Sequence, residues 1–174
     1  MKKFLVVVDM QKDFVIGSLG THEAIAIVPK VVNKVKDFDG ELIVTFDTHS
    51  EDYMNTSEGK KLPVQHCIKG THGWRLVSLL AETLEGREYT AVEKPTFGSV
   101  ELPKIIKDKA GNEEFSIELV GLCTDICVVS NALLLKAHFP EVTISVDSKC
   151  CAGVTVESHN AALQTMKMCQ IDVI

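Results

Sequence analysis

The sequence predicts a three-layer α/β/α single domain of the Rossmann-like class, with a mostly parallel sheet. Strand-like runs alternate with helical patterns along the chain, and most of these runs are continuously apolar. Continuous apolar runs are typical of strands covered on both faces, and strand–helix alternation favours right-handed crossovers and parallel strands. No linker or repeat divides the 174 residues. That length suits one domain, which we expect to span residues 1–174.

Each element is predicted from its own pattern of apolar residues. Strand signals cover residues 4–10, 41–48, 89–95, 115–122, 141–148 and 171–174. Helical spacing covers residues 23–38, 73–84, 100–109, 124–139 and 156–169. Pro29 and Pro103 weaken two of these helices, because proline disfavours a helix interior. The stretch from His49 to Gly73 is long and irregular, which favours a functional loop.

Composition narrows the classes of partner and the cellular location. The formal net charge of −6 argues against nucleic acid or an anionic membrane as the main partner. The apolar run at residues 4–8 is too short for a signal peptide, and no run is long enough for a membrane span. We therefore expect a cytoplasmic protein whose six cysteines are free thiols. Homo-oligomers are common among domains of this kind, so self-association is compatible with the sequence.

Chemically active residues follow four successive predicted strands. Asp9 follows the first, Asp47 and His49 the second, Lys94 the third, and the segment "CTDIC" the fourth. Sites in open parallel sheets form at the carboxyl ends of strands. We therefore expect these residues to meet at one edge of the sheet.

Within "GLCTDICVV", the two cysteines are expected to differ in role. Thr124 or Asp125 is the predicted N-cap of the following helix, so Cys127 falls in its first turn. The helix dipole and free N–H groups there would stabilise a thiolate and an oxyanion. Cys123 lies before the cap, which argues against a pair of thiols one turn apart. The alternative is that both cysteines are small buried apolar residues.

A nucleophilic cysteine needs a base and a stabilising charge. Asp9 could accept the thiol proton, and Lys94 could lower the thiol pKa. The alternatives are a cap or salt bridge for Asp9 and a solvated strand end for Lys94. His159 most simply belongs to the start of the last helix.

Asp47 and His49 share one side of an extended segment, and Glu58 and His66 follow in the loop. Histidines with carboxylates suit Zn²⁺, Mn²⁺ or Fe²⁺ with open positions. The commoner alternative is a set of solvated loop side chains.

The chain resembles the isochorismatase-like cysteine hydrolases. The resemblance rests on "VVVDMQKDF", "EKPTFGSV", "GLCTDICV" and "VDSKCCAGVTVESHNAALQTM", and it spans nearly the whole chain in order. The pattern "DTH…E…HCIKGTHG" is similar to the nicotinamidase/pyrazinamidase branch. The resemblance implies hydrolysis of nicotinamide, or of a related small amide, through a thioester. It also implies one divalent metal ion, no organic cofactor, and a place in NAD metabolism.

Site residues follow from the same resemblance. The implied catalytic triad is Asp9, Lys94 and Cys127, and the implied oxyanion hole is formed by the backbone N–H groups of Cys123 and Cys127. A non-proline cis peptide is implied at Leu122–Cys123. The remaining implied residues are the metal ligands Asp47, His49 and His66 with Glu58, and the ring-packing residues Phe14 and Phe97.

One departure concerns the ring pocket. Many nicotinamidases carry an aromatic residue just before the second metal histidine, but "LPVQHC" has none. Two alternatives follow: the ring pocket is incomplete, or another residue such as Tyr53 or Trp74 supplies the aromatic ring.

Two other functions stay open at this point. One is a hydrolase of the same family that acts on another amide, a carbamoyl group or a vinyl ether. The other is a non-catalytic binding protein or thiol redox sensor, for which the adjacent Cys150 and Cys151 are the main support. No role is predicted for these two cysteines or for Cys67 and Cys169.

Overall fold

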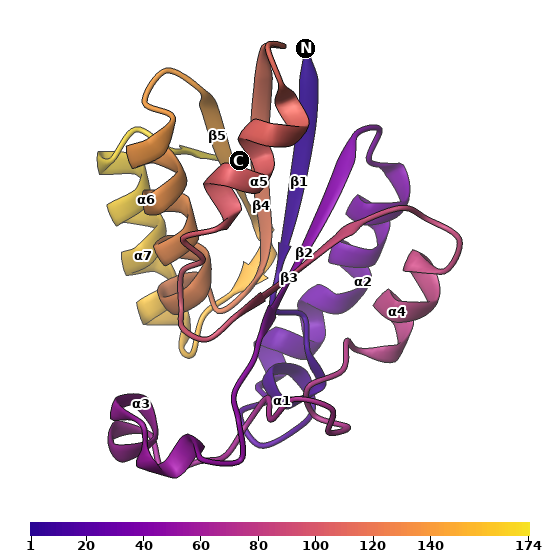
Figure 1. Ribbon diagram of the computed structural model, residues 1–174. Coiled ribbons are helices and arrows are strands. Elements are labelled where there is room, and N and C mark those ends of the chain that lie inside the picture. The colour runs from indigo at the N-terminus through magenta and orange to yellow at the C-terminus, as the bar shows by residue number, and fades with distance from the viewer.

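The computed structural model describes all residues from 1 to 174 and contains a six-stranded sheet (Figure 1). Its strands run in the order β3-β2-β1-β4-β5-β6, and every neighbouring pair is parallel. The strands are β1 (Lys2–Val8), β2 (Glu41–Asp47), β3 (Thr90–Lys94), β4 (Phe115–Leu122), β5 (Thr143–Ala152) and β6 (Asp172–Val173). All six predicted strands are therefore present, and the expected parallel sheet is confirmed.

Helices cover both faces of the sheet, as the three-layer prediction requires (Figure 1). One face is covered by α2 (His22–Asp37) and α4 (Ser78–Leu84), and the other by α5 (Leu102–Ala110), α6 (Val129–His138) and α7 (Val156–Met168). Short elements occupy the carboxyl edge, namely α1 (Lys12–Val15), the 3₁₀ turn η1 (Tyr53–Asn55), α3 (Ser57–Lys61) and the π-helical turn η2 (Thr124–Val128). Three of these short elements, α1, η1 and α3, were not predicted.

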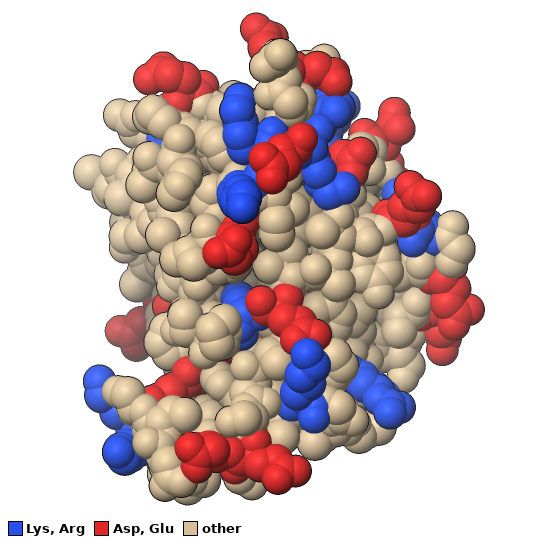
Figure 2. Space-filling view, in the orientation of Figure 1, with Lys and Arg blue, Asp and Glu red and all other residues tan.

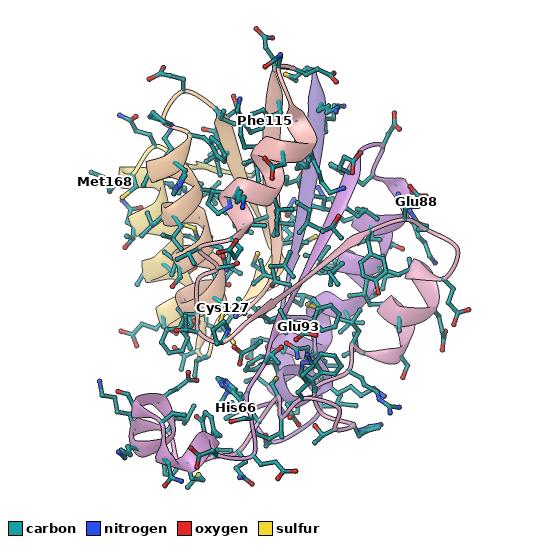
Figure 3. All side chains as sticks on the ribbon, viewed as in Figure 1. His66, Glu88, Glu93, Phe115, Cys127 and Met168 are labelled. Atoms are coloured by element: carbon teal, nitrogen blue, oxygen red, sulfur yellow. The ribbon has the colours of Figure 1, made fainter.

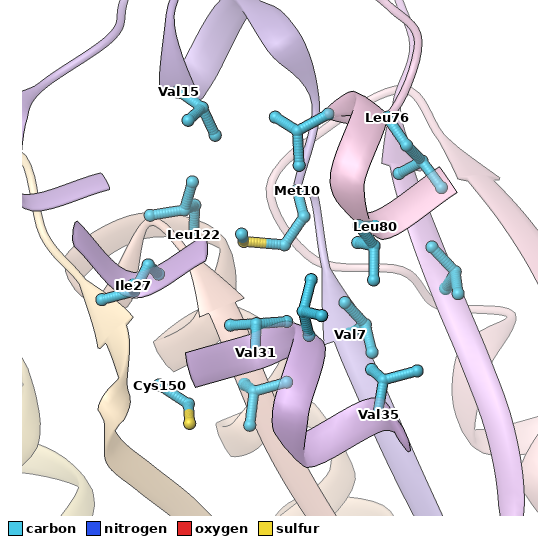
Figure 4. Close-up of a cluster of buried hydrophobic side chains, with 14 of the residues drawn as sticks. Val7, Met10, Val15, Ile27, Val31, Val35, Leu76, Leu80, Leu122 and Cys150 are labelled. Atoms are coloured by element: carbon cyan, nitrogen blue, oxygen red, sulfur yellow. The ribbon is translucent and has the colours of Figure 1, made fainter. Parts of the chain in front are cut away.

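The central strand β1 contributes to two hydrophobic cores. Leu5 and Val7 face α2, while Phe4 and Val6 face α5 and α6, and all four are fully buried. Figure 4 shows the first core, where Val7 packs among side chains of α2 and α4. Each such buried side chain stabilises the fold by about 1.5–3 kcal/mol. This burial explains why the strand reads as a continuous apolar run.

Two predicted helices differ in detail from the structure. Helix α4 begins at Ser78 rather than at residue 73, because the preceding backbone pairs with the segment after β1. In that pairing Lys12 N donates to Arg75 O, and Val77 N donates to Met10 O. Pro29 lies inside α2 on its exposed side, and Pro103 occupies the first turn of α5, where proline is favoured. Both helices therefore tolerate their prolines.

All six cysteines are free. Cys150 and Cys151 point into opposite cores, Cys67 is buried beside His66, and Cys169 is exposed. The adjacent pair thus fills space on the two faces of β5.

Acidic and basic side chains are interspersed on the face shown in Figure 2, without a large patch of one sign. None of the helices combines the length and the apolar character that crossing a membrane would require.

A partly buried ion cluster joins α2 to the sheet. Lys34 Nζ lies 2.6 Å from Glu118 Oε1 and 2.8 Å from Asp147 Oδ2. Partial burial alone would raise the pKa of Asp147, but the hydrogen bond and charge of Lys34 outweigh it and lower that pKa. The stabilisation is therefore complete above the unfolded-state pKa of Asp147 and is lost as the pH falls through the lowered folded-state value.

Replacing Lys34 tests this cluster. Lys34→Met should reduce the free energy of unfolding by about 1 kcal/mol at neutral pH. The difference from wild type should shrink as the pH falls below about 4. Urea denaturation across that range measures both effects, with Lys30→Met on the exposed side of the same helix as the control. A difference that does not change with pH would show that Asp147 is not the responsive group.

Candidate active site

Side chains from four neighbouring strands meet at the carboxyl edge of the sheet. Asp9 follows β1, Asp47 ends β2, Lys94 ends β3, and Cys127 lies in η2 after β4. All four are buried. Figure 3 shows Cys127 and His66 at this same end of the molecule. The strand order β3-β2-β1-β4 therefore assembles residues that lie far apart in the sequence, as the strand-end rule predicts.

Asp9, Lys94 and Cys127 are in direct contact through the lysine. Lys94 Nζ lies 2.6 Å from Asp9 Oδ2 and donates to Cys127 Sγ at 3.4 Å. The other carboxylate oxygen of Asp9, Oδ1, accepts a hydrogen bond from Thr45 Oγ1 at 2.6 Å. Asp9 itself has a φ of +47°, a conformation that is uncommon outside glycine. Because Lys94 is fully buried, the alternative of a solvated strand end is excluded.

The charges in this group interact strongly. Burial raises the pKa of Asp9, although the Lys94 ammonium acts in the opposite direction. Burial and the charge of Asp9 raise the pKa of the Cys127 thiol well above its usual value. Burial alone would lower the pKa of Lys94, but Asp9, Cys127 and Asp47 outweigh it and raise that pKa. Lys94 lowers the thiol pKa, as expected, but burial and the charge of Asp9 outweigh its effect. The pKa values of Asp9 and Cys127 are therefore both raised, chiefly by burial.

Strand β4 packs closely against β1 just before Cys123. Gly121 has a φ of +115°, and a side chain there would collide with the carbonyl oxygen of Val8. The register between β4 and β5 also shifts between Leu119 and Gly121. The peptide bond between Leu122 and Cys123 is cis, as the family resemblance implied.

Cys127 lies in the π-helical turn that leads into α6. The N-cap of this turn is Cys123, whose carbonyl accepts hydrogen bonds from two N–H groups of the turn. The predicted caps are wrong because both side chains bond elsewhere. Asp125 accepts from the N–H of Val154 at 3.1 Å, and Thr124 bonds to a side chain of α7. The expected position of Cys127 in the first turn is nevertheless confirmed.

Asn131 is a buried residue that sequence reasoning missed. Its Nδ2 donates to Cys127 O at 2.8 Å and to Phe97 O at 3.2 Å, and its Oδ1 accepts from Ser99 N at 2.9 Å. It therefore ties the turn that carries Cys127 to the loop after β3. The available signal was its spacing, because Asn131 lies one helical turn after Cys127 among mostly apolar residues.

His159 also has a contact that the sequence did not indicate. It lies in the first turns of α7, as predicted, but its Nδ1 is 2.8 Å from Thr124 Oγ1. Burial lowers the pKa of His159, although Asp125 acts against this shift. A neutral His159 thus links α7 to the π-helical turn.

Asp47, His49, His66 and Glu58 form a second group beside the first. Asp47 Oδ2 lies 2.9 Å from His49 Nε2 and 3.5 Å from His66 Nε2. Glu58 Oε1 lies 3.7 Å and 3.6 Å from the same two nitrogens. The ligand atoms of Asp47, His49 and His66 all fall within 4.8 Å of one another, and these three residues are buried. The structure thus brings together all four residues that the sequence suggested as ligands.

The donor set fits a divalent metal ion. His66 Nδ1 lies 2.8 Å from Val64 O, and a hydrogen bond there leaves the Nε2 lone pair free to bind. Burial alone would lower the pKa of His66, but Asp47 and Glu58 raise it to about 10. The negative charge of this group therefore favours a bound positive charge, which can be a proton or a metal ion. Two imidazoles with carboxylates suit zinc, manganese or iron.

A cavity of about 230 Å³ opens between the two groups. It is lined by Cys127 and Cys123 on one side and by Asp47, Glu58 and His66 on the other. Its remaining lining is mostly apolar and consists of Phe14, Leu19, Thr21, Ala24, Leu62, Phe97, Leu122, Ile126, Gly153 and Val154. The Phe14 ring also packs against the His66 ring at a centroid distance of 5.5 Å.

Tyr53 and Trp74 do not supply the missing ring in this cavity. Tyr53 lies behind the histidines, with ring centroids 4.8 Å from His49 and 5.0 Å from His66. Its hydroxyl donates to Leu62 O at 2.9 Å, and Tyr53 does not line the cavity. Trp74 packs on Phe46 instead. Neither residue lines the cavity, whereas Leu62 does, so the alternative of a ring pocket without that aromatic residue remains.

Comparison with known proteins agrees with this geometry. The isochorismatase domain matches residues 3–174. The chain is 30% identical to the isochorismatase family protein PncA of Bacillus subtilis over 176 residues, which cover 94% of this chain and 93% of that protein. It is 27% identical to a nicotinamidase of Schizosaccharomyces pombe over 207 residues, which cover 98% of this chain and 91% of that protein.

Solved structures of similar proteins share the fold. The nicotinamidase/pyrazinamidase PncA from Bacillus subtilis superposes with a TM-score of 0.87 at 25% identity, over 99% of both chains. A pyrazinamidase of Pyrococcus horikoshii in complex with zinc superposes with a TM-score of 0.84 at 23% identity, over 100% of this chain and 99% of that one. The sequence match over nearly the whole length and the shared fold lead to one conclusion: this chain belongs to the isochorismatase family.

Proposed function

We propose that this chain is a metal-containing cysteine amidohydrolase that converts nicotinamide to nicotinate and ammonia. The observation that carries the proposal is the placement of Lys94 Nζ, 2.6 Å from Asp9 Oδ2 and 3.4 Å from Cys127 Sγ. The cavity beside Cys127 is largely apolar, and its size suits a small ring. Nicotinamidases among the relatives support the choice of substrate.

In the proposed first half-reaction, Asp9 accepts the proton of the Cys127 thiol. Lys94 keeps its proton and balances the negative charge during this transfer. The sulfur then attacks the amide carbonyl carbon, and the carbonyl oxygen becomes an oxyanion held by the N–H groups of Cys123 and Cys127. The Cys123 N–H donates no hydrogen bond to another group of the chain, which supports this role.

Asp9 next returns the proton to the amide nitrogen. The carbon–nitrogen bond breaks, ammonia leaves, and a thioester remains on Cys127. In the second half-reaction Asp9 removes a proton from water, the water oxygen bonds to the thioester carbon, and the carbon–sulfur bond breaks. Asp9 gives the proton that it took from water to the sulfur, and the acid leaves. The raised pKa of Asp9 suits a group that accepts and returns protons in turn.

Asp47, His49 and His66 would hold the metal ion, with Glu58 as a further oxygen ligand. Zinc, manganese and iron all suit these donors. A bound metal ion would supply a Lewis acid for the ring nitrogen of the substrate. Phe14 would pack on the ring, and Phe97 would cover it from the opposite wall. The scheme needs no organic cofactor.

Replacing each cysteine separately tests the assignment of the nucleophile. Cys127→Ala should reduce ammonia release from nicotinamide by a factor of about 1,000 or more, because no thioester can form. Cys123→Ala should change it by less than about tenfold, since its proposed role uses only its backbone N–H. Circular dichroism and metal content serve as controls for folding. Substantial turnover by Cys127→Ala, or equal losses in both variants, would contradict the assignment.

Removing the metal tests the second group. Dialysis against a chelator should abolish nicotinamide hydrolysis, and adding back zinc, manganese or iron should restore it. His66→Ala should weaken Zn²⁺ binding by more than about 100-fold, because it removes a direct ligand. Glu58→Gln should have a smaller effect, because it retains an oxygen donor. Full activity in protein shown to be metal-free by elemental analysis would rule out the metal's role.

A further inference from the structure

The segment between β1 and α1 carries a fully buried glutamine that contacts both peptide groups of Asp47. Gln11 Oε1 accepts from Asp47 N at 2.8 Å, and Gln11 Nε2 donates to Asp47 O at 2.9 Å. The same Nε2 donates to Trp74 O at 2.8 Å. All three bonds are buried or partly buried, so the carboxamide cannot turn without leaving polar groups unpaired. The backbone of Asp47 is thus held on both sides by one side chain.

Asp13, two residues further on, holds the segment that follows His66. Its Oδ2 accepts from Cys67 N at 2.8 Å, and its own N–H donates to Gly73 O at 3.0 Å. A side chain at Gly73 would collide with the Asp13 carboxylate. Cys67 has a φ of +48°, and its carbonyl accepts from His49 N at 3.0 Å. One carboxylate therefore fixes the peptide that links His66 to the His49 strand end.

These contacts set the separation of the metal-ligand segments. Asp47 is the last residue of β2, whereas His66 lies in the long loop after it. No helix or strand contains both residues, although an isolated parallel bridge between His49 and Ile68 also joins this loop to the end of β2. Gln11 and Asp13 anchor both to the same short segment, which is continuous with β1. Metal sites depend on such outer contacts, because small shifts of a ligand weaken binding.

We infer that Gln11 and Asp13 are positioning residues of the metal site, which hold Asp47 and His66 at binding distance without touching the metal. The inference rests on the metal site in the proposed function. A purely structural role would make the two residues important for folding but not for the metal affinity of the folded protein.

The test compares Zn²⁺ affinity among variants of the full chain. Metal-free proteins are titrated with Zn²⁺ in competition with a chromogenic chelator, and thermal unfolding of each metal-free protein is recorded separately. Gln11→Met and Asp13→Ala should each raise the Zn²⁺ dissociation constant by about 10- to 100-fold. Asp13→Asn, which retains an oxygen that can accept from Cys67 N, should recover most of the affinity. Lys12→Ala, between the two positions, should change it by less than about twofold.

Each result separates the two roles. Lower thermal stability with an unchanged Zn²⁺ dissociation constant would overturn the inference, because it leaves only a structural role. If Gln11→Met does not fold, the comparison of Asp13→Ala with Asp13→Asn decides, since Asp13 is only half-buried. Failure of the wild-type protein to bind Zn²⁺ would remove both the metal site and this inference. Tight wild-type binding with unaffected variants would remove the inference alone.

Discussion

The buried ammonium group of Lys94 is the interaction on which the rest of the site depends. A charge without access to water costs several kcal/mol unless partners surround it. Lys94 Nζ has such partners, with Asp9 Oδ2 at 2.6 Å, Thr96 O at 3.1 Å, Asp47 Oδ1 at 3.3 Å and Cys127 Sγ at 3.4 Å. One cation therefore contacts both buried carboxylates, Asp9 and Asp47, and offsets part of their negative charge.

The same ammonium connects the cysteine group with the metal-ligand group. Asp47 directs Oδ1 toward Lys94 and Oδ2 toward His49 and His66. Its carboxylate orientation is thus set from both sides, and burial of the whole edge strengthens each contact. A metal ion next to Asp47 and a cation beside Cys127 would then share one carboxylate. This arrangement explains why the cysteine group and the metal-ligand group lie so close together beside one cavity.

Much of the fold was predictable, because its determinants are local. The five-residue run Phe4–Val8 is buried on both faces, and that burial is directly visible as a run of apolar residues. Because the carboxyl ends of parallel strands lie at one edge of the sheet, the sequence also predicted that Asp9, Asp47 and Lys94 lie close together. The chemical roles of these residues, argued from residue type and from the resemblance, stay predictions.

Other features depend on contacts between distant segments, which a single sequence does not reveal. The helix α4 starts late because its leading residues pair with the Gln11 segment. Thr124 and Asp125 fail to cap η2 because α7 and the loop before it offer other partners. Tyr53 is aromatic and close in sequence to the ligands, yet its ring packs behind them. In each case the side-chain direction is set by tertiary packing.

The central claim is that the amide of nicotinamide is hydrolysed through a covalent intermediate on Cys127. Mixing the enzyme with nicotinamide, quenching with acid within the first turnovers and sequencing the peptides by mass spectrometry tests it directly. We expect a nicotinoyl group on Cys127 alone, which disappears once the substrate is consumed. A nicotinoyl group on Cys123 or on any other residue, with Cys127 unmodified, would contradict the account.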